Sequence, residues 1–202
     1  MPINLLCHKM KTKISVIVPL AIGLITRVAS GQSTLDEGYM PGLTVTGGDP
    51  VGVVDREAFD DAQAGDTVAD MTVNLQLLGG YNGDLYVSLI APDGTSAVLL
   101  DEPGAGVNGF GASGAGMNIT LSDDSANAIQ NETSAIPLTN TYQPADLLTV
   151  FQGAPAAGTW VLYCANLGMG DGPTTLVSWG MDITVLKNPS PSKSPSSRTI
   201  FP

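Results

Sequence analysis

Histidine is nearly absent from this chain of 202 residues: the only one, His8, lies close to the N-terminus. Lysine is absent between Asp36 and Leu186. The region after residue 31 therefore cannot supply a Ser-His-Asp triad, a Cys-His pair or a histidine zinc site, and residues 36–186 cannot supply a Schiff-base lysine. A pair of carboxylates could still serve a glycosidase, but the acidic residues lie in turn-like segments. These absences predict that the chain is not an enzyme.

Cysteine is also scarce, with only Cys7 and Cys164 present. Cys164 alternates with Trp160 and Leu162 in an apolar pattern, so we interpret it as a small buried hydrophobic residue; a reactive thiol is the alternative. Without disulfides the domain must be held together by its core, which about 150 residues can supply.

The N-terminal segment has the order of a secretory signal peptide. A basic stretch, Lys9–Lys13, precedes the apolar run Ile14–Ile25 and the small residues Val28–Gly31. The apolar run is shorter than the roughly 20 residues that span a bilayer. An uncleaved N-terminal anchor is the alternative. We expect residues 1–31 to be a signal peptide, and the protein to be secreted or at the cell surface, without membrane contact after cleavage.

Basic residues are few, 8 against 19 acidic ones. All 19 acidic residues and four basic residues follow residue 31, so the net charge there is 4 − 19 = −15. Such a surface repels phosphate backbones and attracts cations, and nucleic acid is excluded as a partner.

The remaining sequence predicts strands. Met71–Leu77 alternates apolar and polar residues, and Asp84–Ile90 and Ala97–Leu100 flank the turn Pro92-Asp-Gly-Thr95. No window longer than ten residues keeps a helical period. The loop 102–116 holds six glycines and is expected to be long and mobile. Further strands are expected at residues 53–59, 117–121, 147–151, 159–165 and 176–185. The pattern predicts an all-β jelly-roll sandwich of about eight strands.

Composition divides the chain further. Residues 32–50 are predicted to be a linker or an irregular first strand, and residues 51–186 the sandwich domain. The Pro/Ser-rich residues 187–202 are expected to be a disordered tail.

Five motifs occur in a fixed order along the predicted domain. They are Asn82-Gly-Asp-Leu with Pro92-Asp-Gly-Thr95, then Phe151-Gln-Gly, Gly158-Thr-Trp-Val-Leu162, Gly168-Met-Gly-Asp-Gly172 and Ser178-Trp179. In this order the sequence resembles the P domain (homo B domain) of proprotein convertases and other subtilisin-like serine proteases.

The resemblance implies a galactose-binding-domain-like jelly roll. It also implies an accessory role beside a serine endopeptidase, stabilising the protease or contacting proteins during proteolysis. The expected partner is a subtilisin-like protease or another secreted protein. This chain departs from the pattern, because nothing before Val51 could form the catalytic domain.

Calcium is a possible ligand, since the resemblance implies a domain that tunes the calcium dependence of the protease, and short oxygen-bearing side chains on loops suit calcium. The candidate ligands are Asp123, Asp124, Asn166 and Asp171; Asn166 stands where the family often has aspartate. Solvated loop carboxylates are the alternative.

Three residues are predicted to be structural: Asp84 at the start of a strand, and Trp160 and Trp179 as core aromatics. If the tryptophans were exposed instead, the chain would fit a carbohydrate-binding sandwich. An acidic structural surface protein is a further alternative.

Overall fold

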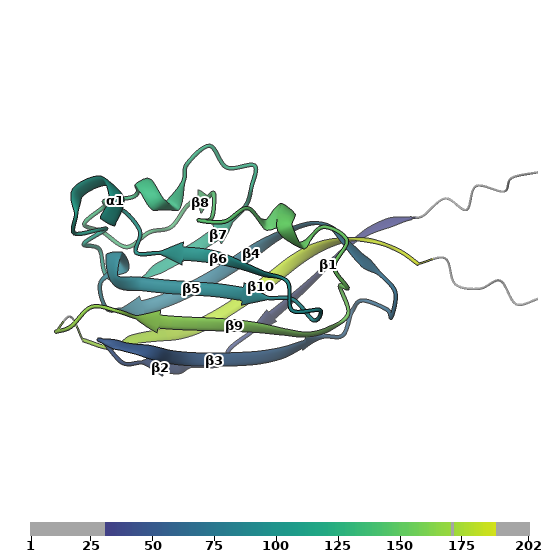
Figure 1. Cartoon of the computed structure of the whole chain (residues 1–202), viewed down its shortest axis with the longest axis horizontal. Coiled ribbons are helices and arrows are strands. Elements are labelled where there is room, and N and C mark those ends of the chain that lie inside the picture. Colours follow the sequence, from purple (N-terminus) through teal and green to yellow (C-terminus); the bar gives the residue numbers. More distant parts are fainter. Residues whose placement is uncertain (1–30, 171, 189–202) are drawn as a thin grey trace, which may run out of the picture.

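The chain forms two β-sheets packed face to face, in a computed structural model that describes residues 31–170 and 172–188 (Figure 1). The predicted signal peptide, apart from Gly31, lies outside the described residues, as do Asp171 and the tail from residue 189. The predicted all-β sandwich is confirmed. The described residues contain no helix long and apolar enough to cross a membrane.

The larger sheet has six strands and the smaller has four. The larger follows the order β1 (Gln32–Tyr39), β10 (Thr174–Leu186), β4 (Thr67–Gly79), β7 (Met117–Leu121) and β8 (Thr141–Tyr142), with β2 (Leu43–Val45) also pairing with β10. The smaller follows the order β3 (Asp49–Phe59), β9 (Gly158–Asn166), β5 (Leu85–Ile90) and β6 (Ser96–Asp101). Only the β7–β8 pairing is parallel among these strands.

The described helices are single turns: α1 (Ala105–Asn108) and the 3-10 helices η1 (Asn82–Asp84), η2 (Ile129–Asn131) and η3 (Leu148–Phe151). The strand predicted at 147–151 is therefore wrong. The Asp123 carboxylate accepts hydrogen bonds from the backbone N–H groups of Leu148 (2.7 Å) and Thr149 (2.8 Å). These bonds satisfy donors at the start of a helical turn, which would otherwise be left open.

Residues 32–50 include two strands, so the sandwich has ten strands where about eight were predicted. β1 pairs with β10 over eight residues, from Gln32 opposite Leu186 to Tyr39 opposite Trp179. Leu35 and Tyr39 pack against the core. Glu37 also links β1 to the other sheet. Its carboxylate accepts hydrogen bonds from the N–H groups of Asp60 (2.7 Å) and Asp61 (2.8 Å), which directly follow β3.

The core lies between the sheets and is built by alternation. On β4 the apolar residues Met71, Val73, Leu75 and Leu77 are buried, while the polar residues between them face outward. Period-2 alternation places one set of side chains in the core and the other in solvent. The largest fully buried side chains include Phe59, Phe151, Trp160 and Trp179.

Both tryptophans are core residues with satisfied indole N–H groups. Trp160 is 0% exposed and donates to the Ala156 carbonyl at 3.0 Å, and Trp179 is 2% exposed and donates to the Asp55 carboxylate at 2.7 Å. Cys164 is fully buried on β9, and burial raises the pKa of its thiol to about 12. Such a thiol is not nucleophilic near neutral pH.

Candidate functional site

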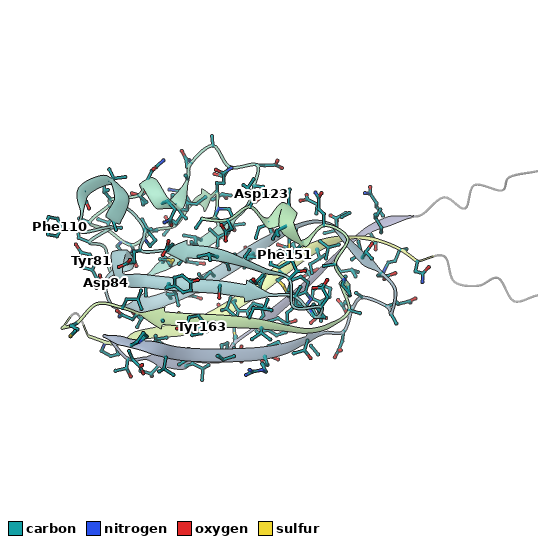
Figure 2. The ribbon with its side chains drawn as sticks, viewed as in Figure 1. Tyr81, Asp84, Phe110, Asp123, Phe151 and Tyr163 are labelled. Atoms are coloured by element: carbon teal, nitrogen blue, oxygen red, sulfur yellow. The ribbon has the colours of Figure 1, made fainter. Side chains whose placement is uncertain are left out.

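One end of the sandwich gathers irregular segments, and we call it the loop end. It comprises residues 78–84 with η1, the loop 102–116 with α1, Ile136, and residues 167–170 and 172–173 between β9 and β10. Figure 2 shows Tyr81, Asp84 and Phe110 together at this end (left), whereas β1 begins and β10 ends at the opposite end.

Glycines let the backbones of the loop end pack directly on one another. The Gly83 N–H donates to the Ala112 carbonyl at 2.9 Å, and the Asn82 N–H donates to the Gly114 carbonyl at 2.9 Å. A Cβ atom on Gly83 would lie 2.7 Å from the Cα of Gly111, closer than atoms can approach. The loop 102–116, expected to be mobile, is thus hydrogen-bonded to η1. Its glycines serve close packing as well as turns.

Asn82 fixes the same loop from inside. Its side chain is fully buried, and its amide N–H donates to the Gly116 carbonyl at 2.9 Å. The bond spans 34 residues of sequence and holds the last residue of the loop 102–116 against η1.

Asp84 and Asn166 hold the β9–β10 connection. The Asp84 carbonyl accepts the Leu167 N–H at 2.8 Å, and the Asp84 carboxylate lies directly against Gly168, where any Cβ would overlap it. Asn166 is fully buried; its side-chain oxygen accepts the Gly168 N–H at 3.2 Å and its amide donates to the Thr174 hydroxyl at 3.1 Å. Asp84 and Asn166 therefore determine how this connection leaves the sheet.

The fixed loops expose large apolar side chains. Phe110 is 80% exposed, Met169 90%, Ile136 68% and Val107 59%. No charged residue occurs between Pro103 and Gly116 or between Thr133 and Ala145, although the chain is strongly acidic. The loop end thus exposes large apolar side chains on well-anchored backbone, and Asp84 and Glu102 are the charged residues in the part of it that the structure describes. Sequence reasoning missed these residues, because isolated apolar residues among glycines show no periodicity.

The predicted calcium ligands do not form one group among the described residues. Asp123 lies away from Asp84 (Figure 2), and its carboxylate already accepts two backbone N–H groups at η3, while Asn166 holds the loop end. Asp124 follows Asp123 and makes only a backbone bond to the Ser122 hydroxyl. Asp171 is outside the described residues, in which no set of three or more His, Cys, Asp or Glu side chains has metal-binding spacing. Calcium binding stays a prediction.

Aromatic residues are poorly arranged for stacking on sugars. Both tryptophans are buried. On the outer face of the smaller sheet, Tyr86 and Tyr163 meet edge to face, with ring centroids 6.0 Å apart and planes at 66°. The coplanar exposed pair that the carbohydrate-binding alternative needs is not formed by these residues.

Comparisons with known proteins identify a family. The model of the proprotein convertase P-domain matches residues 68–183, whereas no curated protein matches the sequence. Among solved structures, the fold is similar to the Aeromonas sobria serine protease in complex with its chaperone ORF2 (TM-score 0.50, 14% identity, 78% of this chain and 28% of that chain). The same protease without the chaperone gives a TM-score of 0.47 at 15% identity, covering 76% of this chain and 27% of that one. The structure of FlhE gives a TM-score of 0.43 at 13% sequence identity, covering 78% of this chain and 99% of that one.

The chain thus spans about a quarter of the protease chain it resembles, and at this identity the likeness concerns the fold alone. The family match includes the Gly83-Asp-Leu strand, the Trp160 strand and Ser178-Trp179, but no catalytic domain. Because the matched residues 68–183 are more than half of the sequence, the chain belongs to the proprotein convertase P-domain family.

Proposed function

We propose that this P domain is a secreted, non-catalytic accessory module that stabilises a subtilisin-like serine protease by docking on it through the loop end. The observation that carries the proposal is the exposure of Phe110 and Met169, 80% and 90%, on a backbone anchored by Asn82, Asp84 and Asn166. Exposed apolar patches with polar surroundings are typical of protein interaction sites.

The anchoring matters for affinity. A docking surface that is ordered before it binds loses little conformational entropy on association. Large apolar side chains at the centre of an interface are the groups whose truncation weakens binding most. Phe110 and Met169 are therefore the side chains that we expect to enter pockets of the partner.

The absence of a histidine after residue 8 supports a role without catalysis. We expect the purified chain to show no peptidase activity of its own. Calcium is kept as a proposed ligand of the module, for which the family resemblance is the support.

The test uses the full chain and a subtilisin-like protease from the same genome that lacks a P domain. We expect a 1:1 complex by calorimetry and a longer half-life of the protease on heating. The double variant Phe110→Asp/Met169→Asp should weaken binding at least about tenfold, or about 1.4 kcal/mol, without lowering the melting temperature.

Val150→Asp is the matched control, because Val150 is 49% exposed in η3. The residues after η3 bond to Val68, at the end of β4 opposite the loop end. Val150→Asp should bind as the wild type does. Equal binding by the loop-end variant would exclude this surface, and the lack of any complex with such a protease would exclude the proposed partner.

A further inference from the structure

The outward face of the larger sheet carries a second feature, a hollow of about 360 Å³. It lies across β1, β10, β4 and β7, and none of its lining residues belongs to the loop end. Its walls include Asp36, Met40, Asn74, Gln76 and Asp182. The volume is at the small end of ligand pockets, and suits one side chain or a small molecule.

Two glycines line the hollow. Gly38 on β1 and Gly180 on β10 lie opposite each other in register, where other residues would place side chains. A Cβ atom on Gly38 would meet nothing within 4 Å, so it would extend into open space. Neither glycine has a positive φ. A Cβ atom on Gly180 would lie 2.6 Å from the Glu37 carbonyl oxygen, so the close approach of β1 requires glycine at position 180 but not at position 38. The missing side chain at position 38 therefore creates space.

Two hydrogen-bond donors beside the hollow bind the carboxylate of Asp182, and a third binds one of those donors' side chains. The Thr72 hydroxyl (3.2 Å) and the Asn74 amide (3.1 Å) both donate to Oδ2 of Asp182, and the Thr120 hydroxyl donates to Oδ1 of Asn74 at 2.8 Å. These bonds hold Asp182 in place. Carboxylates accept hydrogen bonds, so a group that binds to Asp36 and Asp182 must bring donors.

Asp36 lies directly opposite Asp182 on the adjacent strand. Like charges in directly opposed positions of a sheet destabilise it. No lysine or arginine lines the hollow. Of the two basic side chains in the described residues, Lys187 is bonded to Asp66 at 2.8 Å and Arg56 belongs to β3 of the other sheet. A cation from outside would relieve the repulsion.

We propose that the hollow binds the side chain of an arginine supplied by a protein partner. A guanidinium group has five N–H donors and no acceptor, and its planar shape matches carboxylates. This is complementary to the two carboxylates Asp36 and Asp182, which accept hydrogen bonds. Met40, 87% exposed at the rim, offers apolar surface to the stem of the arginine. The inference extends the proposed role as a protein-binding module, but its test does not involve a protease.

The experiment titrates the isotope-labelled full chain with an acetylated, amidated Gly-Gly-Arg-Gly-Gly peptide and follows backbone amides by NMR. Saturable shifts should concentrate at Gly38, Gly180 and their neighbours. A peptide with citrulline, which keeps the shape of arginine without its charge, should bind at least about tenfold more weakly. Asp36→Asn/Asp182→Asn should weaken arginine binding by a similar factor.

Two variants separate specific binding from general attraction to an acidic protein. Asp93→Asn/Asp101→Asn removes the same charge from exposed positions before and at the end of β6 and should change the affinity less than about twofold. Gly38→Val keeps every charge, suits a strand, and should abolish the shifts by filling the hollow.

Shifts spread over the acidic surface, or equal losses in the two double Asn variants, would overturn the proposal. Equal binding of the citrulline peptide would also overturn it, and would indicate a site for neutral hydroxyl or amide groups. Retained binding by a folded Gly38→Val would exclude the hollow.

Discussion

Asp66 provides the sharpest test of what holds the sandwich closed. It is 2% exposed in the turn before β4, and its carboxylate accepts three hydrogen bonds near the end of β10. The donors are the Lys187 ammonium (2.8 Å) and the backbone N–H groups of Asn188 (3.0 Å) and Gln63 (3.0 Å). Asp66→Ala removes the acceptor and leaves the donors behind.

Hydrogen bonds to a charged group contribute about 1.5–3 kcal/mol each when they are buried. Here the loss is smaller per bond, because the Lys187 side chain is 33% exposed and can be solvated after the substitution. We therefore expect Asp66→Ala to lower the free energy of unfolding by about 2–4 kcal/mol. Asp61→Ala, in the same turn with an exposed side chain, is the control and should change it by less than about 0.5 kcal/mol.

The pH dependence gives an independent check. Burial alone would raise the pKa of Asp66, but the bonds from Lys187, Gln63 and Asn188 and the charge of Lys187 lower it below its usual value. A carboxylate with a lowered pKa contributes stability above its unfolded pKa, about 3.9, and loses it as the pH falls through the folded value. The difference between wild type and Asp66→Ala should be constant from about pH 5 to 7 and shrink below about pH 4.

Urea unfolding followed by the fluorescence of the buried tryptophans measures the loss of unfolding free energy, and repeating it at several pH values measures the pH dependence of that loss. A loss below about 0.5 kcal/mol at pH 7 would show that Asp66 does not stabilise the fold. A gap that stays constant down to pH 2 would show that its ionised form is not the stabilising one.

Three further outcomes are expected, two from described contacts and one from the family resemblance. Asp123→Ala should destabilise the chain by about 1–2 kcal/mol, seen as a lower melting temperature, because two N–H groups of η3 lose their acceptor; an unchanged melting curve would refute this role. Cys164 should resist iodoacetamide at pH 8 until denaturant is added, since its pKa is about 12, and rapid labelling of the native protein would contradict its burial. Millimolar calcium should raise the melting temperature by several degrees over chelator, as expected for a ligand that binds only the folded state; identical curves would remove calcium from the account.

The strands that local pattern predicts best are those with one buried face. β4 alternates so regularly that Met71 and Leu77 could be assigned to the core from sequence alone. β1 could not be assigned, because its residues are mostly polar and pair with residues of β10 that lie 140 to 154 positions away. The helical turn η3 was missed for the same reason: the carboxylate that caps it, Asp123, is 25 residues distant.

The candidate site was less accessible to sequence reasoning than the fold. Six glycines in 102–116 predicted mobility, and only the contact of Gly83 with Gly111 shows that they permit close packing. Asn166 could be singled out from a family pattern, but its burial and its bonds across the connection depend on tertiary neighbours. A short motif therefore identified where the loop end lies without indicating which side chains it exposes.

The two proposed surfaces should respond to salt in opposite directions. Of the 19 acidic residues only Asp171 is outside the described part, which has Arg56 and Lys187 as its basic residues, so its net charge is 2 − 18 = −16. This field repels an acidic partner that approaches the loop end, and salt screens it over about 8–10 Å. Docking at Phe110 by an acidic protease should therefore strengthen from 50 mM to 300 mM NaCl, about two- to fivefold, while arginine binding at Asp36 and Asp182 should weaken. Calorimetry at the two salt concentrations measures both, and a parallel loss of affinity would show that one acidic surface serves both ligands.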